Sequence, residues 1–67
     1  MSQLGEKIKE ARLYKDMTQA QLAKALGVPQ NTLSQWENGR RQTPVEMIRP
    51  IAVALDCDPN YLLGFGE

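Results

Sequence analysis

The feature that most constrains this chain is the stretch 18–39, TQAQLAKALGVPQNTLSQWENG, which predicts two short helices joined by a tight turn. Thr18 and Gln21 have the spacing of a capping box, which marks the start of a helix. Gly27 is expected to end that helix, because a residue without a Cβ readily adopts the left-handed conformation of a helix end. A second helix follows the turn and is expected to end at Glu37.

The second predicted helix begins near Pro29 and has two chemically different faces. At about 100° per residue, Leu33 and Trp36 fall on one side, as expected of residues that pack into a core. The other side carries amides and a hydroxyl but no charge: Gln30, Asn31, Ser34 and Gln35. Such side chains can donate to and accept from base edges in a DNA major groove. The stretch is therefore typical of a helix-turn-helix whose second helix recognises DNA.

Length and charge limit the possible functions. The 67 residues make one small domain, residues 1–67, with room for a small core only. The formal net charge is zero, but residues 1–43 sum to +3 and residues 44–67 to −3, so the half with the motif is positive. With no His and a single Cys, the sequence offers no usual set of zinc ligands. It also has neither a phosphate-binding glycine loop nor an acid pair in a pocket-forming context, so we expect neither an enzyme nor a bound cofactor, metal or small-molecule ligand.

The sequence gives no sign of a membrane or export segment. No apolar run approaches the roughly 20 residues that span a bilayer. Residues 5–10 carry two Lys and two Glu, where a signal peptide requires an apolar region. We therefore expect a cytoplasmic protein without a membrane partner.

Residues on either side of the motif predict three more helices. A first helix has an apolar stripe at helical spacing, formed by Leu4, Ile8 and Ala11. A fourth helix has a longer stripe, formed by Ile48, Ile51, Ala52 and Leu55. A short last helix opens at Asp58-Pro59, and its Tyr61 and Leu62 are expected to close the core. The predicted fold class is therefore all-α, a compact array of five helices.

Two local features of the fourth helix carry specific predictions. Thr43 and Glu46 repeat the capping-box spacing, with Pro44 at the first helical position. Pro50 lies inside the helix, where it removes one backbone hydrogen bond and clashes with the preceding turn. We expect the helix to start at the Thr43 cap and to kink at Pro50.

The motif and its flanks resemble one known family. TQAQLAKALGVPQNTLSQWENGRR is similar to the signature of the lambda-repressor-like (Cro/Xre-type) helix-turn-helix family. Upstream, LGEKIKEAR resembles the family's first helix, and downstream, PIAVALDCDPNYLLG resembles its last two. The resemblance covers residues 4–64 and implies a compact five-helix fold with the helix-turn-helix at helices 2 and 3. It also implies a transcriptional regulator, most often a repressor, that binds double-stranded DNA sequence-specifically.

Several positions depart from the family pattern. Leu13 and Tyr14 stand where relatives usually have polar residues, and they either pack against a neighbouring loop or form part of a contact surface. Asp16 stands where relatives usually have Gly, and Asp tolerates a left-handed conformation better than most residues. Pro29 offers no side-chain oxygen to cap the recognition helix. Cys57 replaces an apolar residue, so we expect a small buried hydrophobe with an unreactive thiol.

Within this family framework, roles can be assigned to the motif residues. Gln30, Asn31 and Gln35 are expected to contact bases, as is Ser34, which alternatively meets only a phosphate or water. Contacts to the DNA backbone are expected from Thr18, Gln19, Asn38, Arg40 and Arg41. The resemblance places Gln19 either on this backbone or against Gln30. Arg12 and Glu37 match positions that form an internal ion pair in family members, and such a pair would hold the first helix to the third.

A single module reads only a few base pairs, so we expect a homodimer on a pseudo-palindromic operator. Leu63 and Phe65 are the candidate dimer contacts, unless they only cover the core. The chain is either a stand-alone regulator or the DNA-binding part of a longer protein. One alternative function is the antitoxin of a toxin–antitoxin pair, which binds both DNA and a toxin. Another is a protein-interaction module with the same fold and no DNA binding, which the zero net charge and Pro29 favour and Arg40-Arg41 disfavours.

Overall fold

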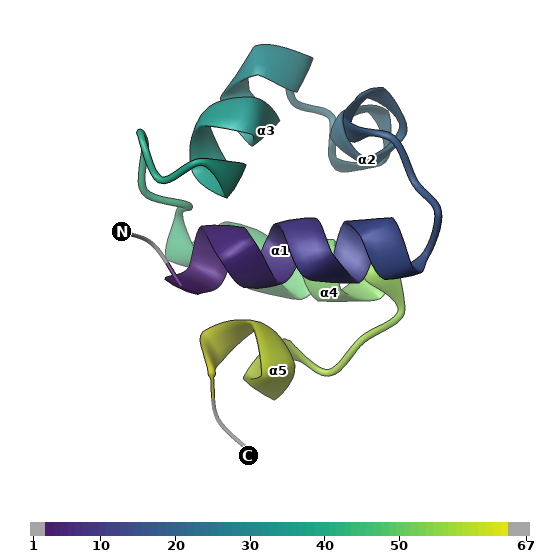
Figure 1. The fold of residues 1–67 in the computed structure, drawn as a ribbon, viewed down its shortest axis with the longest axis vertical. Helices are drawn as coiled ribbons and strands as arrows, with labels where there is room; N and C mark the ends of the chain where they lie inside the picture. Colours follow the sequence, from purple (N-terminus) through teal and green to yellow (C-terminus); the bar gives the residue numbers. More distant parts are fainter. Residues whose placement is uncertain (1–2, 65–67) are drawn as a thin grey trace.

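Six helical segments follow one another in the described part of the chain, residues 3–64, in the computed structural model (Figure 1). They are α1 (Gln3–Tyr14), α2 (Gln19–Leu26), α3 (Gln30–Glu37), the 3-10 helix η1 (Val45–Met47), α4 (Ile48–Leu55) and α5 (Pro59–Leu63). Figure 1 shows α2 and α3 on one side of α1 and α5 on the opposite side. The all-α prediction with five α-helices is confirmed, and η1 is an addition to it. None of the helices in residues 3–64 is long and apolar enough to cross a membrane.

The apolar stripes of all five α-helices meet in one core. Its largest fully buried side chains are Ile8, Leu22, Leu33, Ile51, Leu55 and Leu62. Leu4, Ile48 and Tyr61 are only partly buried and pack against this cluster. Burying a large aliphatic side chain stabilises a fold by roughly 1.5–3 kcal/mol, so one or two such residues from each α-helix carry much of the stability. The predicted stripes therefore point to the core.

The helix ends of the motif form as the sequence predicts. Thr18 Oγ1 accepts a hydrogen bond from the backbone N–H of Gln21 (3.0 Å), and Gln21 Oε1 accepts one from the N–H of Thr18 (2.8 Å). Gly27 ends α2 with a left-handed φ of 74°. Asp16, in the preceding turn, also has a positive φ, 55°. The local signals of the motif thus determine where α2 starts and ends.

The start of the fourth helix is the main correction to the sequence analysis. The capping box predicted for Thr43 and Glu46 is wrong: Pro44 caps η1 without any side-chain hydrogen bond, and the buried Thr43 hydroxyl has no partner within residues 3–64. Because η1 takes up the first turn, α4 begins only at Ile48. Pro50 therefore lies in the first turn of α4, where a backbone N–H has no partner within the helix. The expected kink assumed that Pro50 lies in the middle of the fourth helix, and the structure does not place it there.

A close approach of two helix backbones was not predicted. Gly5 is buried on α1, where a Cβ would lie 2.9 Å from the carbonyl oxygen of Glu37 and would clash with that of Trp36. The end of α3 thus rests directly on the backbone of α1. Only glycine fits here without displacing one of the two helices.

Cys57 is partly rather than fully buried, so the expectation of a buried residue is wrong in degree. The side chain packs against the core from the turn between α4 and α5. Burial raises the pKa of the Cys57 thiol, and the carboxylates of Asp58 and Asp56 raise it further, against an opposing effect of Lys15. The thiol therefore stays protonated to a higher pH than a free cysteine.

A thiol reagent is expected to modify Cys57 slowly in the folded protein and rapidly in denaturant. The reason is that the thiolate is the reactive form, and both burial and the raised pKa reduce its population. The measurement is the labelling rate at neutral pH with and without denaturant, compared with a short peptide containing one Cys. Labelling of the folded protein at the peptide's rate would contradict the assignment of Cys57 as a packing residue.

Candidate nucleic-acid interface

The two faces predicted for α3 are confirmed. Leu33 and Trp36 are buried in the core. On the opposite side, Gln30 and Asn31 are exposed, whereas Ser34 and Gln35 are half-buried. None of these four outer side chains has a hydrogen-bond partner within residues 3–64. The helix thus presents unpaired donors and acceptors on the side away from the core.

A surface hollow joins this face of α3 to the start of α2. The hollow is lined by Gln19, Gln30, Asn31 and Ser34. All four residue types carry hydrogen-bonding groups, so the hollow is suited to a polar ligand edge. Three of the expected base-contacting residues and one expected backbone-contacting residue therefore lie together. Gln35, the remaining residue of the set, does not line the hollow.

The loop after α3 places two cationic side chains beside the motif. The backbone N–H groups of Arg40 and Arg41 both donate to the carbonyl oxygen of Gln35, at 3.0 and 3.2 Å, which folds the loop back on the helix end. Arg40 and Arg41 are exposed. Asn38 Oδ1 accepts from the N–H of Arg40 (3.0 Å), which turns the amide oxygen of Asn38 inward. The amide nitrogen of Asn38 thus remains available to donate a hydrogen bond to a ligand.

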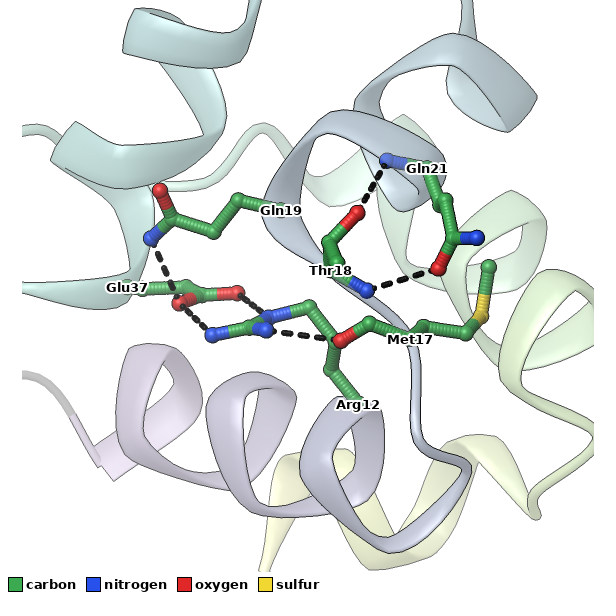
Figure 2. A network of polar contacts seen from close by, with 6 residues as sticks. All are labelled: Arg12, Met17, Thr18, Gln19, Gln21 and Glu37. Atoms are coloured by element: carbon green, nitrogen blue, oxygen red, sulfur yellow. Dashed lines mark hydrogen bonds and ion pairs between the residues drawn. The ribbon is translucent and has the colours of Figure 1, made fainter.

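A buried ion pair links α1 to the end of α3, as the resemblance implies (Figure 2). Arg12 Nε lies 2.7 Å from Glu37 Oε2, and Arg12 Nη2 lies 3.0 Å from Glu37 Oε1. The third guanidinium nitrogen, Nη1, donates to the carbonyl oxygen of Met17 at 2.8 Å. Arg12 is 7% exposed and Glu37 5%. Two-point pairing of this kind fixes both orientation and position.

Gln19 joins the same network. Its amide nitrogen, Nε2, donates to Glu37 Oε1 at 3.0 Å. The resemblance placed Gln19 on the DNA backbone or against Gln30, whereas in the structure its amide is held by a buried carboxylate (Figure 2). Sequence reasoning missed this contact, because 18 positions separate the two residues and no local pattern connects them.

Several large apolar side chains lie outside the core. Tyr14 is 85% exposed and Leu13 is 54% exposed, so neither is covered by a neighbouring loop. Leu63, one of the two candidate dimer contacts, is 43% exposed at the end of α5. Phe65, the other, lies outside the described residues. The dimer contact itself stays a prediction.

Comparison with known sequences identifies relatives of the chain. The helix-turn-helix family HTH_3 matches residues 8–62. Repressor protein C2 of Salmonella phage P22 is 37% identical over 60 residues, which are 90% of this chain and 28% of that repressor. The HTH-type transcriptional regulator DicA of Escherichia coli is 34% identical over 64 residues, 96% of this chain and 47% of DicA. Antitoxin PezA of Streptococcus pneumoniae is 38% identical over 45 residues, 67% of this chain and 28% of PezA.

The chain thus spans less than half the length of each of these three relatives. Among solved structures, the restriction-modification controller protein C.AhdI from Aeromonas hydrophila matches with a TM-score of 0.84 and 30% identity, over 91% of this chain and 92% of that one. The P22 c2 repressor in complex with a synthetic operator matches with a TM-score of 0.79 and 36% identity, over 88% and 89%. These similarities confirm the lambda-repressor-like fold. The chain belongs to the HTH_3 helix-turn-helix family of Cro/C1 or Xre type.

Proposed function

We propose that the chain is a sequence-specific DNA-binding transcriptional regulator, most simply a repressor, that acts in the cytoplasm. The observation that carries the proposal is the uncharged, hydrogen-bonding outer face of α3, whose side chains have no partner within residues 3–64. The relatives support it: C2 is named a repressor, DicA a transcriptional regulator, and the P22 c2 structure contains operator DNA. None of these names describes an enzyme, in agreement with the expectation for this chain.

Within this proposal, the exposed residues of α3 read base edges. The exposed amides of Gln30 and Asn31 can each pair in two places with adenine, which offers an acceptor and a donor side by side in the major groove. Ser34 and Gln35 are half-buried, so less of each side chain is accessible to DNA. They therefore contribute closer or water-mediated contacts.

Groups on either side of α3 hold the DNA backbone. Arg40 and Arg41 supply charge from the loop, and Asn38 supplies an amide nitrogen. The N–H groups that follow Thr18 lie at the start of α2, where the helix dipole favours a phosphate. Such contacts set the position of the protein on the duplex without reading its sequence.

The proposal includes a homodimer on DNA, because one recognition helix covers too few base pairs for a specific site. In a symmetric dimer the half-sites lie about one helical turn apart, roughly 10 base pairs between their centres. Leu63, exposed at the end of α5, is the contact that we propose within the described residues.

Selection of bound sequences from random double-stranded DNA tests the proposal. The expected result is an enriched palindrome whose half-site spacing gives the dimer geometry. An enriched sequence without symmetry would overturn the homodimer. No enrichment even at low salt would overturn DNA reading and favour the protein-interaction module.

Replacing Gln30 by Ala is expected to cost about 1–3 kcal/mol of binding free energy on the selected operator and little on random DNA. Replacing Arg41 by Ala should weaken both DNAs equally and lower the salt dependence by about one ion per contact. Binding isotherms on both DNAs at several salt concentrations measure these effects.

Matched controls exist for both variants. Asn60→Ala removes an exposed amide from α5, on the other side of α1, and Arg49→Ala removes an exposed cation outside the motif. Asn60→Ala is expected to leave operator preference unchanged, and Arg49→Ala is expected to leave affinity and its salt dependence unchanged. Equal weakening of all DNAs by Gln30→Ala would make Gln30 a backbone contact, and specificity would then belong to the other residues of α3 or to DNA shape.

An antitoxin is the second candidate function. The similarity to PezA supports it, and so do the exposed Leu13 and Tyr14 at the end of α1, which offer apolar surface to a protein partner. Co-purification with a toxin encoded beside the chain would favour this function. A protein that purifies alone and binds its operator unaided would contradict it.

A further inference from the structure

We propose that Glu37 is a positioning residue for DNA recognition: it holds the amide of Gln19 so that the hollow beside α3 presents a carbonyl acceptor. The inference rests on the proposed DNA-binding function and deepens it. It makes Gln19 a determinant of sequence preference, whereas the family resemblance places it on the DNA backbone or against Gln30.

The orientation of Gln19 follows from the chemistry of its partner. An ionised carboxylate only accepts hydrogen bonds, so the side of the amide that faces Glu37 must be its NH₂ group. The 3.0 Å contact from Nε2 to Oε1 has this arrangement. The carbonyl oxygen of Gln19 then lies on the far side of the amide from Glu37 (Figure 2).

Glu37 is itself held firmly. Arg12 binds both of its carboxylate oxygens, at 2.7 and 3.0 Å, and both residues are buried. The planar guanidinium holds its N–H donors in a rigid fork that matches the geometry of a carboxylate. The carboxylate therefore does not rotate freely, and Glu37 fixes the orientation of the Gln19 amide from the core side.

The fixed amide gives the hollow a hydrogen-bond acceptor, the carbonyl oxygen of Gln19. Gln19 lines it together with Gln30, Asn31 and Ser34. In the major groove, the amino groups of adenine and cytosine donate, whereas phosphate oxygens only accept. A carbonyl acceptor therefore selects an amino N–H, directly or through the amide of Gln30, whereas a phosphate, which only accepts, cannot pair with this oxygen.

The test uses Glu37→Gln and Gln19→Met on the operator selected by the unchanged protein. Glu37→Gln keeps the shape of residue 37 but lets it donate, so the Gln19 amide is free to turn over. Gln19→Met keeps the length of the side chain but removes the acceptor without touching the ion pair. Each variant is expected to reduce the preference at the same symmetric pair of base positions by about tenfold, with unchanged affinity for random DNA. The double variant should lose no more preference than Gln19→Met alone, because Glu37 acts through Gln19.

Folding is controlled separately from recognition. Far-UV circular dichroism defines the temperature at which each variant is folded. Ile51→Val supplies a core destabilisation on α4, outside the motif, that should leave base preference unchanged. If Glu37→Gln does not fold, the base preference of Gln19→Met alone tests the inference.

Three results would overturn the inference while DNA binding stands. They are an unchanged base preference in folded Glu37→Gln, an unchanged preference in Gln19→Met, and equal weakening of operator and random DNA by Gln19→Met. Failure of the unchanged protein to select any sequence is a different result, which overturns the proposed function and the inference with it.

Discussion

Replacing Arg12 by Ala is expected to lower the free energy of unfolding by about 3–5 kcal/mol, the cost of leaving one partner of a buried ion pair uncompensated. Within residues 3–64, Glu37, 5% exposed, would keep only the neutral amide of Gln19 as a side-chain hydrogen-bond partner. A single core of this size rarely supplies more than about 3–5 kcal/mol, so the variant is expected to be largely unfolded at room temperature. Urea unfolding followed through the fluorescence of the buried Trp36 measures the effect.

Two controls separate the buried pair from charge in general. Lys9→Ala removes an exposed cation from the same helix and should change stability by less than about 0.5 kcal/mol. Replacing Arg12 and Glu37 together by Met removes both charges and should recover much of the loss, because apolar residues of similar volume often substitute well for a buried pair. An unfolding midpoint for Arg12→Ala equal to that of the unchanged protein would contradict the role given to the pair.

Replacing Gly5 by Ala is expected to destabilise the fold by about 3 kcal/mol, at the upper end of the usual cost of overpacking. The obstructing atoms are the carbonyl oxygens of Trp36 and Glu37, which belong to a helix backbone and cannot rotate away as a side chain can. The sign of the stability change tests the close contact, because alanine in place of glycine inside an unobstructed helix stabilises the helix by roughly 0.5–1 kcal/mol. Thermal and urea unfolding measure the difference.

Ala20→Gly, at an exposed position of α2, supplies the control for helix propensity in this protein. It should cost about 1 kcal/mol, from backbone freedom alone. A stabilised Gly5→Ala variant would mean that α1 and α3 lie further apart than described.

The parts of the fold that could be predicted have their causes close together in sequence. Thr18, Gln21 and Gly27 define α2 through contacts within one or two turns, and the apolar stripes define the buried faces. Thr43 and Glu46 have the same spacing as Thr18 and Gln21. Yet only Thr18 and Gln21 form a capping box. The difference lies in burial: Thr18 is exposed and can turn back to its own helix, whereas Thr43 is packed inside the fold.

The candidate site also has features that could be predicted from local sequence and features that could not. Which side of α3 carries the amides follows from helical periodicity and could be predicted. The direction of the Gln19 amide could not, because it depends on Glu37, 18 positions away, and through it on Arg12. The tight fit at Gly5 likewise depends on two carbonyl groups some 30 residues further along, at Trp36 and Glu37. Each of these features requires knowledge of how α1 meets α3.

The outer side chains of α3 have a consequence for how proteins of this kind diversify. The side chains of Gln30, Asn31, Ser34 and Gln35 have no hydrogen-bond partner within residues 3–64, so exchanging one of them removes no side-chain polar contact inside the described fold. At the exposed positions Gln30 and Asn31, such substitutions usually change stability by less than about 0.5 kcal/mol. Glu37, on the same helix, pairs with Arg12 in the fold and orients the amide of Gln19. Changing Glu37 is therefore expected to lower both stability and base preference. New operator preferences are therefore expected to arise by exchange on the outer face of α3, while Arg12 and Glu37 stay as they are.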